Sequence, residues 1–215
     1  MKIKKIKIAI DSPAAAGAGT VAKRISKHYN LLYLDTGKIY RLLAYLKIKN
    51  KKKFNYLLIK KKIKKLKFKE LENKNLVNDK VGTVAAVIAR DPIIRKLVHN
   101  FQLNCAYKYP QKFNGSCLDG RDITYKIIPD ADFKFFITAN IKVRAKRRHD
   151  ELKKLGKKFS LNYVLNSIKN RDKSDYNRQI SPLKKTKDSI LINTSNLTKS
   201  ACFLKIKKII DGKIK

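Results

Sequence analysis

The chain has 215 residues, enough for one domain with a substantial buried core. Its 53 lysines and arginines outnumber its 16 acidic residues and give a net charge of +37, but the excess is mostly lysine spread among isoleucine and asparagine over the whole length. Since a nucleic-acid surface needs a localised basic patch, this spread indicates a compositional bias, and we expect no dedicated nucleic-acid partner.

The cysteines and histidines lack the spacings of metal ligands. The three cysteines are odd in number and form no C-x-x-C pair, which favours a reducing compartment over disulfides or zinc. The histidines form no H-x-x-x-H arrangement, so no metal site built from protein ligands alone is expected. These residues are Cys105, Cys117, Cys202, His28, His99 and His149.

The amino-terminal segment does not read as a signal peptide. Lys7 and Asp11 interrupt its apolar residues, and no run in the chain approaches the 18 apolar residues of a membrane span. We therefore expect a soluble cytoplasmic protein with no membrane partner.

A short apolar strand, a turn of small residues and a helix start open the chain. Ile6, Ile8 and Ile10 suit a buried strand, and residues 21–29 read as a helix. Free backbone N–H groups at a helix start, approached through small residues, form an anion-binding cradle. The expected phosphate-binding residues are Ser12, Pro13, Ala14, Ala15, Ala16, Gly17, Ala18, Gly19 and Thr20.

This stretch departs from the P-loop pattern G-x-x-x-x-G-K-[ST]. Gly17 is kept, but Ser12 replaces the first glycine and Ala18 replaces the lysine. Gly19 takes the hydroxyl position, and Thr20 follows it. By this motif alone, a plain strand-to-helix turn packed by alanines explains the stretch as well as a phosphate site does.

The next elements place polar residues at the end of a second strand. Residues 31–34 read as a strand, Asp35, Thr36 and Gly37 as a ligand-facing loop, and residues 39–46 as a helix. Arg41 lies one turn beyond the loop, where it either holds a phosphate or is one more surface cation. The lysine-rich residues 47–80 read as a solvated, mobile subdomain.

A helical pattern over residues 81–103 is broken at Asp91 and Pro92, and Arg95 follows the break. Residues 116–118 then form an apolar strand that leads into Asp119, Gly120, Arg121 and Asp122. An aspartate at the end of an apolar strand is typical of the Walker B position, which holds Mg²⁺ through water. A polar loop that acquired these residues by chance is the alternative.

The last third of the chain carries an arginine-rich segment between two strands. Residues 134–138 and 190–194 read as strands, residues 142–178 as helices around Gly156, and a final helix runs through Ile209. Because arginine holds phosphate oxygens bidentately, arginine kept in a lysine-rich chain indicates phosphate binding. A solvated basic hairpin is the alternative. The segment's arginines are Arg144, Arg147, Arg148, Arg171 and Arg178.

Alternating strands and helices with a late basic insertion predict an α/β fold with a parallel sheet and a lid. At this level of detail the chain resembles the bacterial cytidylate kinases, which are P-loop nucleoside monophosphate kinases. The resemblance rests on residues 8–11 with Pro13 and 17–20, 34–37 with 39–41, Pro92 with Arg95, 119–122 with 129–131, 144–145 with 147–148, and 171–172 with Asp175, 177–178 and 182–183. Only residues 47–80 match the family poorly.

The resemblance implies a P-loop NTPase-type three-layer α/β/α fold and transfer of the γ-phosphoryl group of ATP to CMP or dCMP with Mg²⁺. A core (residues 1–46, 81–141 and 179–215), an NMP-binding insertion (47–80) and a lid (142–178) would form one domain, as a monomer. Thr20 and Asp119 would hold the metal through water, and Asp35 and Thr36 would line the acceptor site.

By position, the family's functional residues map onto named residues here. Arg41 and Arg121 would hold the acceptor phosphate, whereas Arg95 and Asp122 would bind the cytosine edge. Arg171 and Asp175 would contact the sugar. The lid closing over the phosphates would contribute Arg147, Arg148 and Arg178.

Three departures qualify the resemblance. Ala18 stands where the family has its P-loop lysine, and loss of such a cation costs several kcal/mol of transition-state stabilisation. We hypothesise that Lys38 replaces it, in preference to Lys23. Ala86 stands where a serine commonly contacts the base, a loss of about 1 kcal/mol that weakens the preference for cytosine over uracil. The insertion also lacks the family's usual strands.

Two other functions stay open at this point. One is a non-catalytic nucleotide- or RNA-binding protein that kept the fold and lost the lysine. The other is a kinase that prefers another acceptor such as UMP. The intact residues 119–122 and the lid arginines favour an enzyme.

Overall fold

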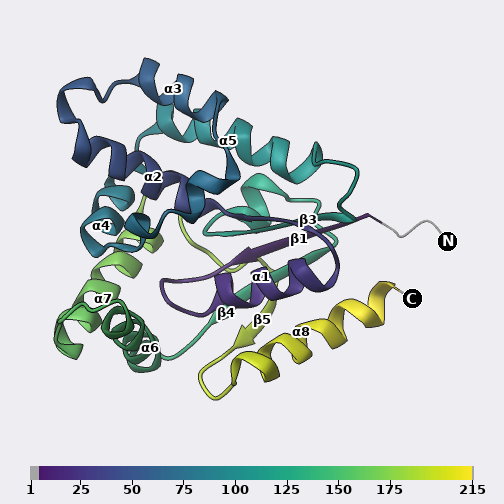
Figure 1. Cartoon of the computed structure of the whole chain (residues 1–215). Coiled ribbons are helices and arrows are strands. Elements are labelled where there is room, and N and C mark those ends of the chain that lie inside the picture. Colours follow the sequence, from purple (N-terminus) through teal and green to yellow (C-terminus); the bar gives the residue numbers. More distant parts are fainter. Residues whose placement is uncertain (1–4, 215) are drawn as a thin grey trace.

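The computed structural model describes residues 5–214, so residues 1–4 of the predicted core segment and Lys215 lie outside the described residues. Five parallel strands form one sheet in the order β2-β3-β1-β4-β5. They are β1 (Ile6–Asp11), β2 (Leu32–Asp35), β3 (Gly115–Gly120), β4 (Phe133–Thr138) and β5 (Ile190–Asn193). Helices cover both faces of the sheet in Figure 1, which confirms the predicted three-layer α/β fold.

One face of the sheet packs against the first and last helices. These are α1 (Ala18–His28) and α8 (Lys199–Ile214), below the sheet in Figure 1. Ile8, Ile10 and Phe135 are fully buried in this layer with Ile25 of α1 and Ile206 of α8. The alternation of large apolar residues in β1 therefore directs its isoleucines to this face.

The other face carries a larger helical layer. Its helices are α2 (Thr36–Lys49), α3 (Tyr56–Lys64), α4 (Asp79–Ile88) and α5 (Pro92–Tyr107). Short 3₁₀ segments connect them: η1 (Lys51–Lys53), η2 (Phe68–Glu72) and η3 (Lys74–Val77). Asp91 caps α5 by accepting from the amides of Ile93 and Ile94 at 2.9 and 3.0 Å, with Pro92 at the first helical position, as the predicted break required.

Residues 47–80 are better packed than the lysine-rich sequence indicated. They form helical segments and no strand within the described part of the chain. Ile59, Ile63, Leu71 and Leu76 are buried in one core with residues of α2. The expectation of a merely solvated segment was therefore wrong, because lysines occupy the outer face while a regularly spaced apolar face points inward.

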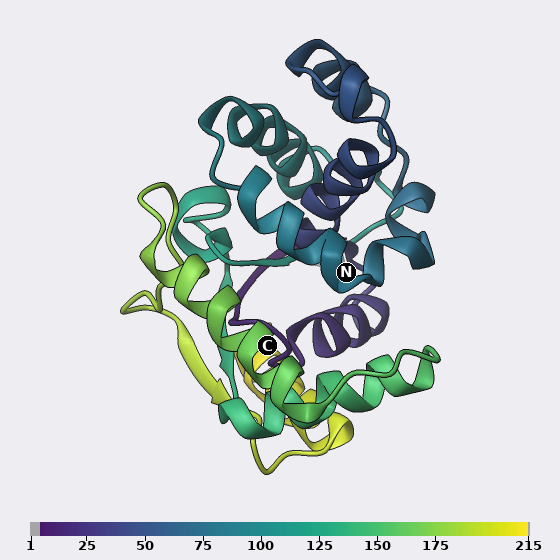
Figure 2. The same ribbon diagram turned by 90° about the vertical axis from the view of Figure 1, so that its left-hand side faces the viewer.

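The arginine-rich segment forms two helices that lie beside the carboxyl ends of the strands, as Figure 2 shows. They are α6 (Ile141–Lys154) and α7 (Leu161–Asn177), joined through Gly156 as predicted. Ala145 and Leu152 of α6 pack on Val164 and Ile168 of α7 in a small separate core. A π-helical turn, η4 (Ile123–Ile127), follows β3.

Two predicted loop assignments were wrong in detail. Asp35 ends β2, whereas Thr36 and Gly37 already belong to α2, and the Asp35 carboxylate caps this helix by accepting from the amide of Lys38 at 3.2 Å. Asp119 and Gly120 are the last residues of β3 and not part of a loop. In both places the acidic residue belongs to the strand, so the sheet fixes the backbone positions of Asp35 and Asp119.

Candidate functional site

A cavity of about 740 Å³ opens at the carboxyl ends of the strands. β1 lies between β3 and β4 in the sheet, and ligands of parallel α/β sheets bind where strand order reverses in this way. The whole stretch 12–20 lines the cavity. The predicted phosphate cradle is thus brought to the centre of the site.

The turn after β1 is shaped to accept an anion. Ala15 and Gly17 have positive φ angles of 58° and 88°. The N–H groups of Gly17, Ala18, Gly19 and Thr20 donate to no acceptor within residues 5–214. Four neighbouring free donors at the start of α1 form a positive nest of the kind that binds phosphate.

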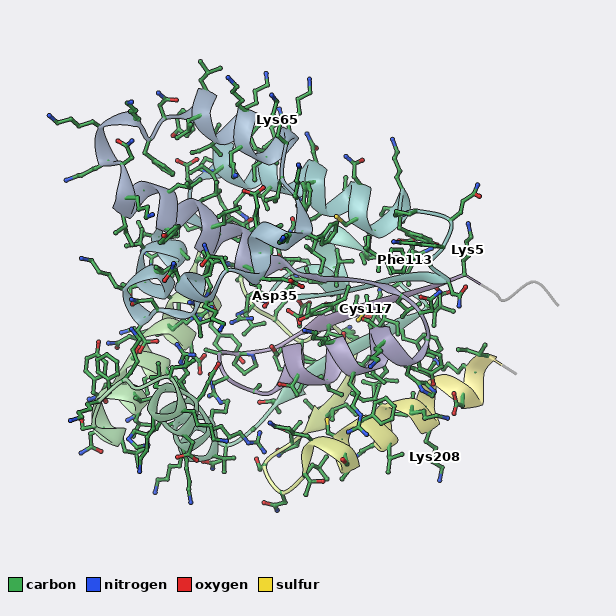
Figure 3. The ribbon with its side chains drawn as sticks, in the orientation of Figure 1. Lys5, Asp35, Lys65, Phe113, Cys117 and Lys208 are labelled. Atoms are coloured by element: carbon green, nitrogen blue, oxygen red, sulfur yellow. The ribbon has the colours of Figure 1, made fainter. Side chains whose placement is uncertain are left out.

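The buried carboxylate of Asp119 and the half-buried carboxylate of Asp35 lie next to the cradle. Burial and the nearby Asp35 carboxylate raise the pKa of Asp119 well above its usual value, although Lys38 and a hydrogen bond from Tyr33 act against the shift. The Tyr33 hydroxyl donates to Asp119 Oδ2 at 2.7 Å. A Cβ atom on Gly19 would lie 3.4 Å from the same oxygen, so Asp119 directly adjoins the P-loop. Figure 3 shows Asp35 between the upper helices and the sheet.

This pair fits a divalent cation that is bound mainly through water and substrate. One or two carboxylates suit Mg²⁺, because this ion keeps several waters in phosphoryl-transfer sites. A cation beside Asp35 and Asp119 would offset the repulsion that raises the pKa of Asp119. Thr20, the other proposed ligand, is exposed and also lines the cavity.

Four arginines from four separate places in the chain meet on the cavity wall. Arg41 comes from α2, Arg121 follows β3, Arg148 comes from α6 and Arg171 comes from α7. Burial, together with the charges of Arg121, Arg41 and Arg148, lowers the pKa of Arg171 to about 9. Such mutual repulsion among arginines indicates a site that suits several negative charges.

The members of this cluster differ in their partners. Arg121 donates from Nε to Asp175 Oδ2 at 2.7 Å, and Arg41 donates from Nη1 to the carbonyls of Leu76 and Asn78 at 2.6 and 3.1 Å. The side chain of Arg171, by contrast, makes no hydrogen bond or ion pair with any residue that the structure describes. It is therefore the cluster member most available to a ligand.

Arg95, Asp122 and Arg178 form a second group beside the cavity. Arg95 pairs with Asp122 and also donates to the carbonyl of Ala89 at 3.0 Å. Arg178 donates to the carbonyl of Ser181 at 2.6 Å, while its Nη2 atom is buried without a partner among the described residues. Arg95 and Asp122 do not line the 740 Å³ cavity, so the structure brings them to each other and not to the phosphate cradle.

The remaining proposed residues are Arg147, Lys38 and Thr36. Arg147 donates to the Thr194 carbonyl at 2.6 Å, and its Nη1 atom lies 4.0 Å from the position of a Cβ atom on Gly17. Lys38 is half-buried and outside the cavity lining, but its charge lowers the pKa of Asp119. Thr36 donates from its hydroxyl to the Asp119 carbonyl at 2.8 Å and so supports that strand end.

Several residues of the site were missed by the sequence analysis. Asp11 is fully buried and accepts from the amides of Ile123 and Thr124 at 2.8 and 2.9 Å, which joins the end of β1 to the turn after Asp122. Asp172 and Thr194 contact the P-loop backbone. Acidic residues are rare in this chain, which has only 16 of them, and this rarity could have drawn attention to Asp11 and Asp172. Nothing in the sequence distinguished Thr194.

The comparison with known families identifies this arrangement. The family model for cytidylate kinase matches residues 8–211. The chain belongs to the cytidylate kinase family. Curated cytidylate kinases from Bartonella tribocorum and Mesomycoplasma hyopneumoniae are 41% and 37% identical to it, over 99% and 100% of this chain and 98% and 97% of theirs.

Other relatives agree with this family membership. The cytidylate kinase of Clostridium botulinum is 39% identical over 95% of this chain and 97% of its own length. A crystal structure of an uncharacterized protein from Eubacterium ventriosum has the same fold, with a TM-score of 0.57 and 18% identity over 97% of this chain and 99% of that one. No helix within residues 5–214 is long and apolar enough to span a membrane.

Proposed function

We propose that this cytidylate kinase family member transfers the γ-phosphoryl group of ATP to CMP or dCMP and forms CDP or dCDP and ADP. The observation that carries the proposal is the meeting of Arg41, Arg121, Arg148 and Arg171 opposite the free N–H groups of residues 17–20. Phosphoryl transfer requires mainly positioning and positive charge around a dispersed negative one, and this cavity supplies both.

The nucleotides would bind from opposite sides of this charge cluster. The cradle would hold the phosphates of ATP, and Arg41 and Arg121 would hold the phosphate of the acceptor. Arg121 is oriented for this by Asp175, which pairs with it at 2.7 Å, while Arg171 and Asp175 would contact the sugar. Arg147 and Arg148 would place further charge over the transferred group.

The base would bind near Arg95 and Asp122. These two side chains form an ion pair, and the buried Nη2 atom of Arg178 has no acceptor among residues 5–214. A buried donor without a partner is costly, and a carbonyl oxygen of the base would remove that cost. Ala86 lies half-buried on α4 and offers no hydrogen bond to the base.

Asp119 and Thr20 would hold Mg²⁺ through water, and the neighbouring Asp35 carboxylate adds negative charge that favours a cation there. When bound, Mg²⁺ supplies charge that neutralises the phosphate oxygens during transfer. Lys38 is proposed to act near the same metal site, because its ammonium is close enough to influence the Asp119 carboxylate. Its positive charge would replace part of the charge of the P-loop lysine, which is absent at Ala18.

The domain boundaries given above, a monomeric state and a cytoplasmic location remain predictions. A nucleotide-binding protein without catalysis remains the competing function because of Ala18. An assay of ADP release with CMP, dCMP, UMP, AMP and GMP as acceptors distinguishes the two. Release with CMP or dCMP above the other acceptors supports the proposal, release with UMP alone reassigns the acceptor, and no release with any of them refutes kinase activity.

A further inference from the structure

A buried ion pair binds both the backbone N–H and the backbone C=O of Ala14. The Ala14 N–H donates to Asp172 Oδ1 at 3.1 Å, and Arg144 Nη1 donates to the Ala14 carbonyl at 2.9 Å. Arg144 Nη1 also pairs with Asp172 Oδ2 at 2.6 Å. The three contacts form a closed ring, in which the exposed fractions of the Arg144 and Asp172 side chains are only 7% and 11%.

The two charged residues are themselves firmly placed. Arg144 lies on α6, where its Nε atom donates to the carbonyl of Ala139 at 3.0 Å. Asp172 lies on α7, which packs on α6 through the small core around Leu152 and Ile168. The base of the arginine-rich segment is therefore bonded directly to the P-loop backbone.

The residue that follows Ala14 has a strained backbone. Ala15 has a φ angle of 58°, a left-handed conformation that its Cβ atom disfavours. On its other side, the Thr194 hydroxyl donates to the Ala16 carbonyl at 3.0 Å. Ala15 thus lies between two peptide groups that buried polar side chains hold in place, which is the condition under which local strain persists in a folded protein.

We propose that Arg144 and Asp172 are a positioning pair for the P-loop. They keep Ala15 in its strained conformation, and so keep the N–H groups of Gly17 to Thr20 turned toward a bound phosphate. Because Ala18 provides no lysine ammonium, the backbone donors carry more of the phosphate binding here, and their geometry has a correspondingly larger effect. The inference rests on the proposed function only in taking the bound phosphates to be those of the ATP donor.

The first test is the variant Asp172→Asn. Whichever way the new amide turns, it loses either the contact from Ala14 or the one from Arg144, since its NH₂ group cannot accept. We expect the Kd for ADP with magnesium, measured by calorimetry, to rise by about tenfold or more, and the Kd for CMP to stay within about twofold. An unchanged Kd for ADP, or equal losses of ADP and CMP affinity, would overturn the proposal.

Two further variants make the test specific. Asp188→Asn removes a carboxylate that pairs with Lys134 at the far side of β4, so it is a matched control that should leave the Kd for ADP unchanged. Adding Ala15→Gly to Asp172→Asn should recover part of the ADP affinity, because glycine adopts a positive φ without strain. A double variant that binds ADP no better than Asp172→Asn would contradict the role given to the strain at Ala15.

Hydrogen exchange of the ligand-free wild type tests the pair apart from any activity. The Ala14 amide should exchange slowly in the wild type and faster by about tenfold or more in Asp172→Asn, with the core strands unaffected. Fast exchange of the Ala14 amide in the wild type would refute the positioning pair. This result is independent of whether the protein phosphorylates CMP, so failure of the proposed function and failure of this inference are distinguishable.

Discussion

Arg148 on α6 and Asp79 at the start of α4 form an ion pair, with Nη2 and Oδ1 2.6 Å apart. Arg148 also donates to the carbonyl of Val77 at 3.2 Å, so one arginine joins α6 to the helical layer on the other side of the cavity. Both Arg148 and Asp79 line that cavity. The two walls are therefore held together through a residue proposed to bind phosphate.

We expect Asp79→Ala to separate these walls more often. Since exposed and partly exposed pairs contribute about 1 kcal/mol or less, the open population should rise by up to roughly fivefold. Trypsin cleavage at the exposed Lys157 and Lys158, between α6 and α7, measures this opening. Glu151→Ala is the control, because Glu151 pairs with Arg148 at 2.8 Å within α6 and does not cross the cavity. Equal cleavage of both variants would contradict the prediction.

Replacing Arg171 by methionine should weaken CMP binding without lowering the free energy of unfolding. Arg171 has no ionic partner among the described residues, and the charges of Arg121, Arg41 and Arg148 act against it. The variant should unfold in urea with a free energy equal to the wild type's or higher by about 1 kcal/mol, whereas CMP affinity should fall at least tenfold. A large loss of stability with CMP affinity intact would refute the role assigned to Arg171.

Lys38→Ala should reduce kcat by roughly tenfold or more if Lys38 replaces the missing lysine, since a cation near the transferred group stabilises the transition state. KM for CMP should change little. Lys23→Ala is a matched control, because Lys23 is an exposed lysine of α1 and should leave kcat unchanged. Steady-state kinetics on the three proteins make the measurement, and unchanged turnover in Lys38→Ala would remove this residue from the mechanism.

Ala86→Ser should increase discrimination between acceptors. One added hydrogen bond to the base contributes about 1 kcal/mol, which corresponds to a roughly fivefold change in the ratio of kcat/KM for CMP to that for UMP. The competition of the two acceptors at fixed ATP measures this ratio directly. A ratio equal to that of the wild type would place the base away from α4.

Asp11 should contribute a pH dependence to stability. Burial raises its pKa from 3.8 to about 6, although the hydrogen bonds from Thr124 and Ile123 partly offset the shift. Because the folded pKa lies above the unfolded one, the contribution is fully present below about pH 4 and is lost as pH rises through about 6, a difference of about 3 kcal/mol.

Urea unfolding at pH 4.5 and pH 7.5 checks this expectation. Asp11→Asn should be less stable than the wild type by about 1–3 kcal/mol at pH 4.5, because its NH₂ group cannot accept and therefore faces either the Ile123 amide or the amide and hydroxyl of Thr124, whichever way the side chain turns. The gap between wild type and variant should narrow at pH 7.5. A gap that widens with pH would show that the pKa of Asp11 is depressed instead.

Much of the fold was predictable because its signals are local. The isoleucine alternation of β1, the break at Asp91 and Pro92, and the glycine between the lid helices each determine structure within a few residues. The family motifs then placed the cradle and Arg121 in one site. Residues 47–80 were misjudged, because the number of lysines obscured the regular spacing of Ile59, Ile63 and Leu71.

The side chains that hold the P-loop in place were less predictable, because their contacts join residues that are far apart in the sequence. Asp172 is 158 positions away from the Ala14 amide that it accepts from, and Thr194 is 178 positions away from Ala16. The sequence analysis named Arg144 only as one of several lid arginines, although its charge is turned to the P-loop and buried. Such pairings depend on where α6 and α7 lie beside the strand ends and have no signature in spacing.

Figure 3 bears on the unusual charge of the protein. The labelled Lys5, Lys65 and Lys208 lie in different parts of its outline, on the N-terminal segment, the upper helical layer and α8. This wide distribution agrees with the compositional bias inferred from the sequence. The arginines of the cavity, by contrast, lie together on its wall.

The central claim is that this family member phosphorylates CMP without a P-loop lysine. Chromatographic detection of CDP from ATP and CMP, with magnesium and with magnesium chelated, tests it most directly, and Arg121→Ala purified in the same way controls for a contaminating host kinase. We predict magnesium-dependent formation of CDP by the wild type and at least 100-fold less by Arg121→Ala. Equal rates for the two preparations, or no CDP from the wild type, would contradict the account.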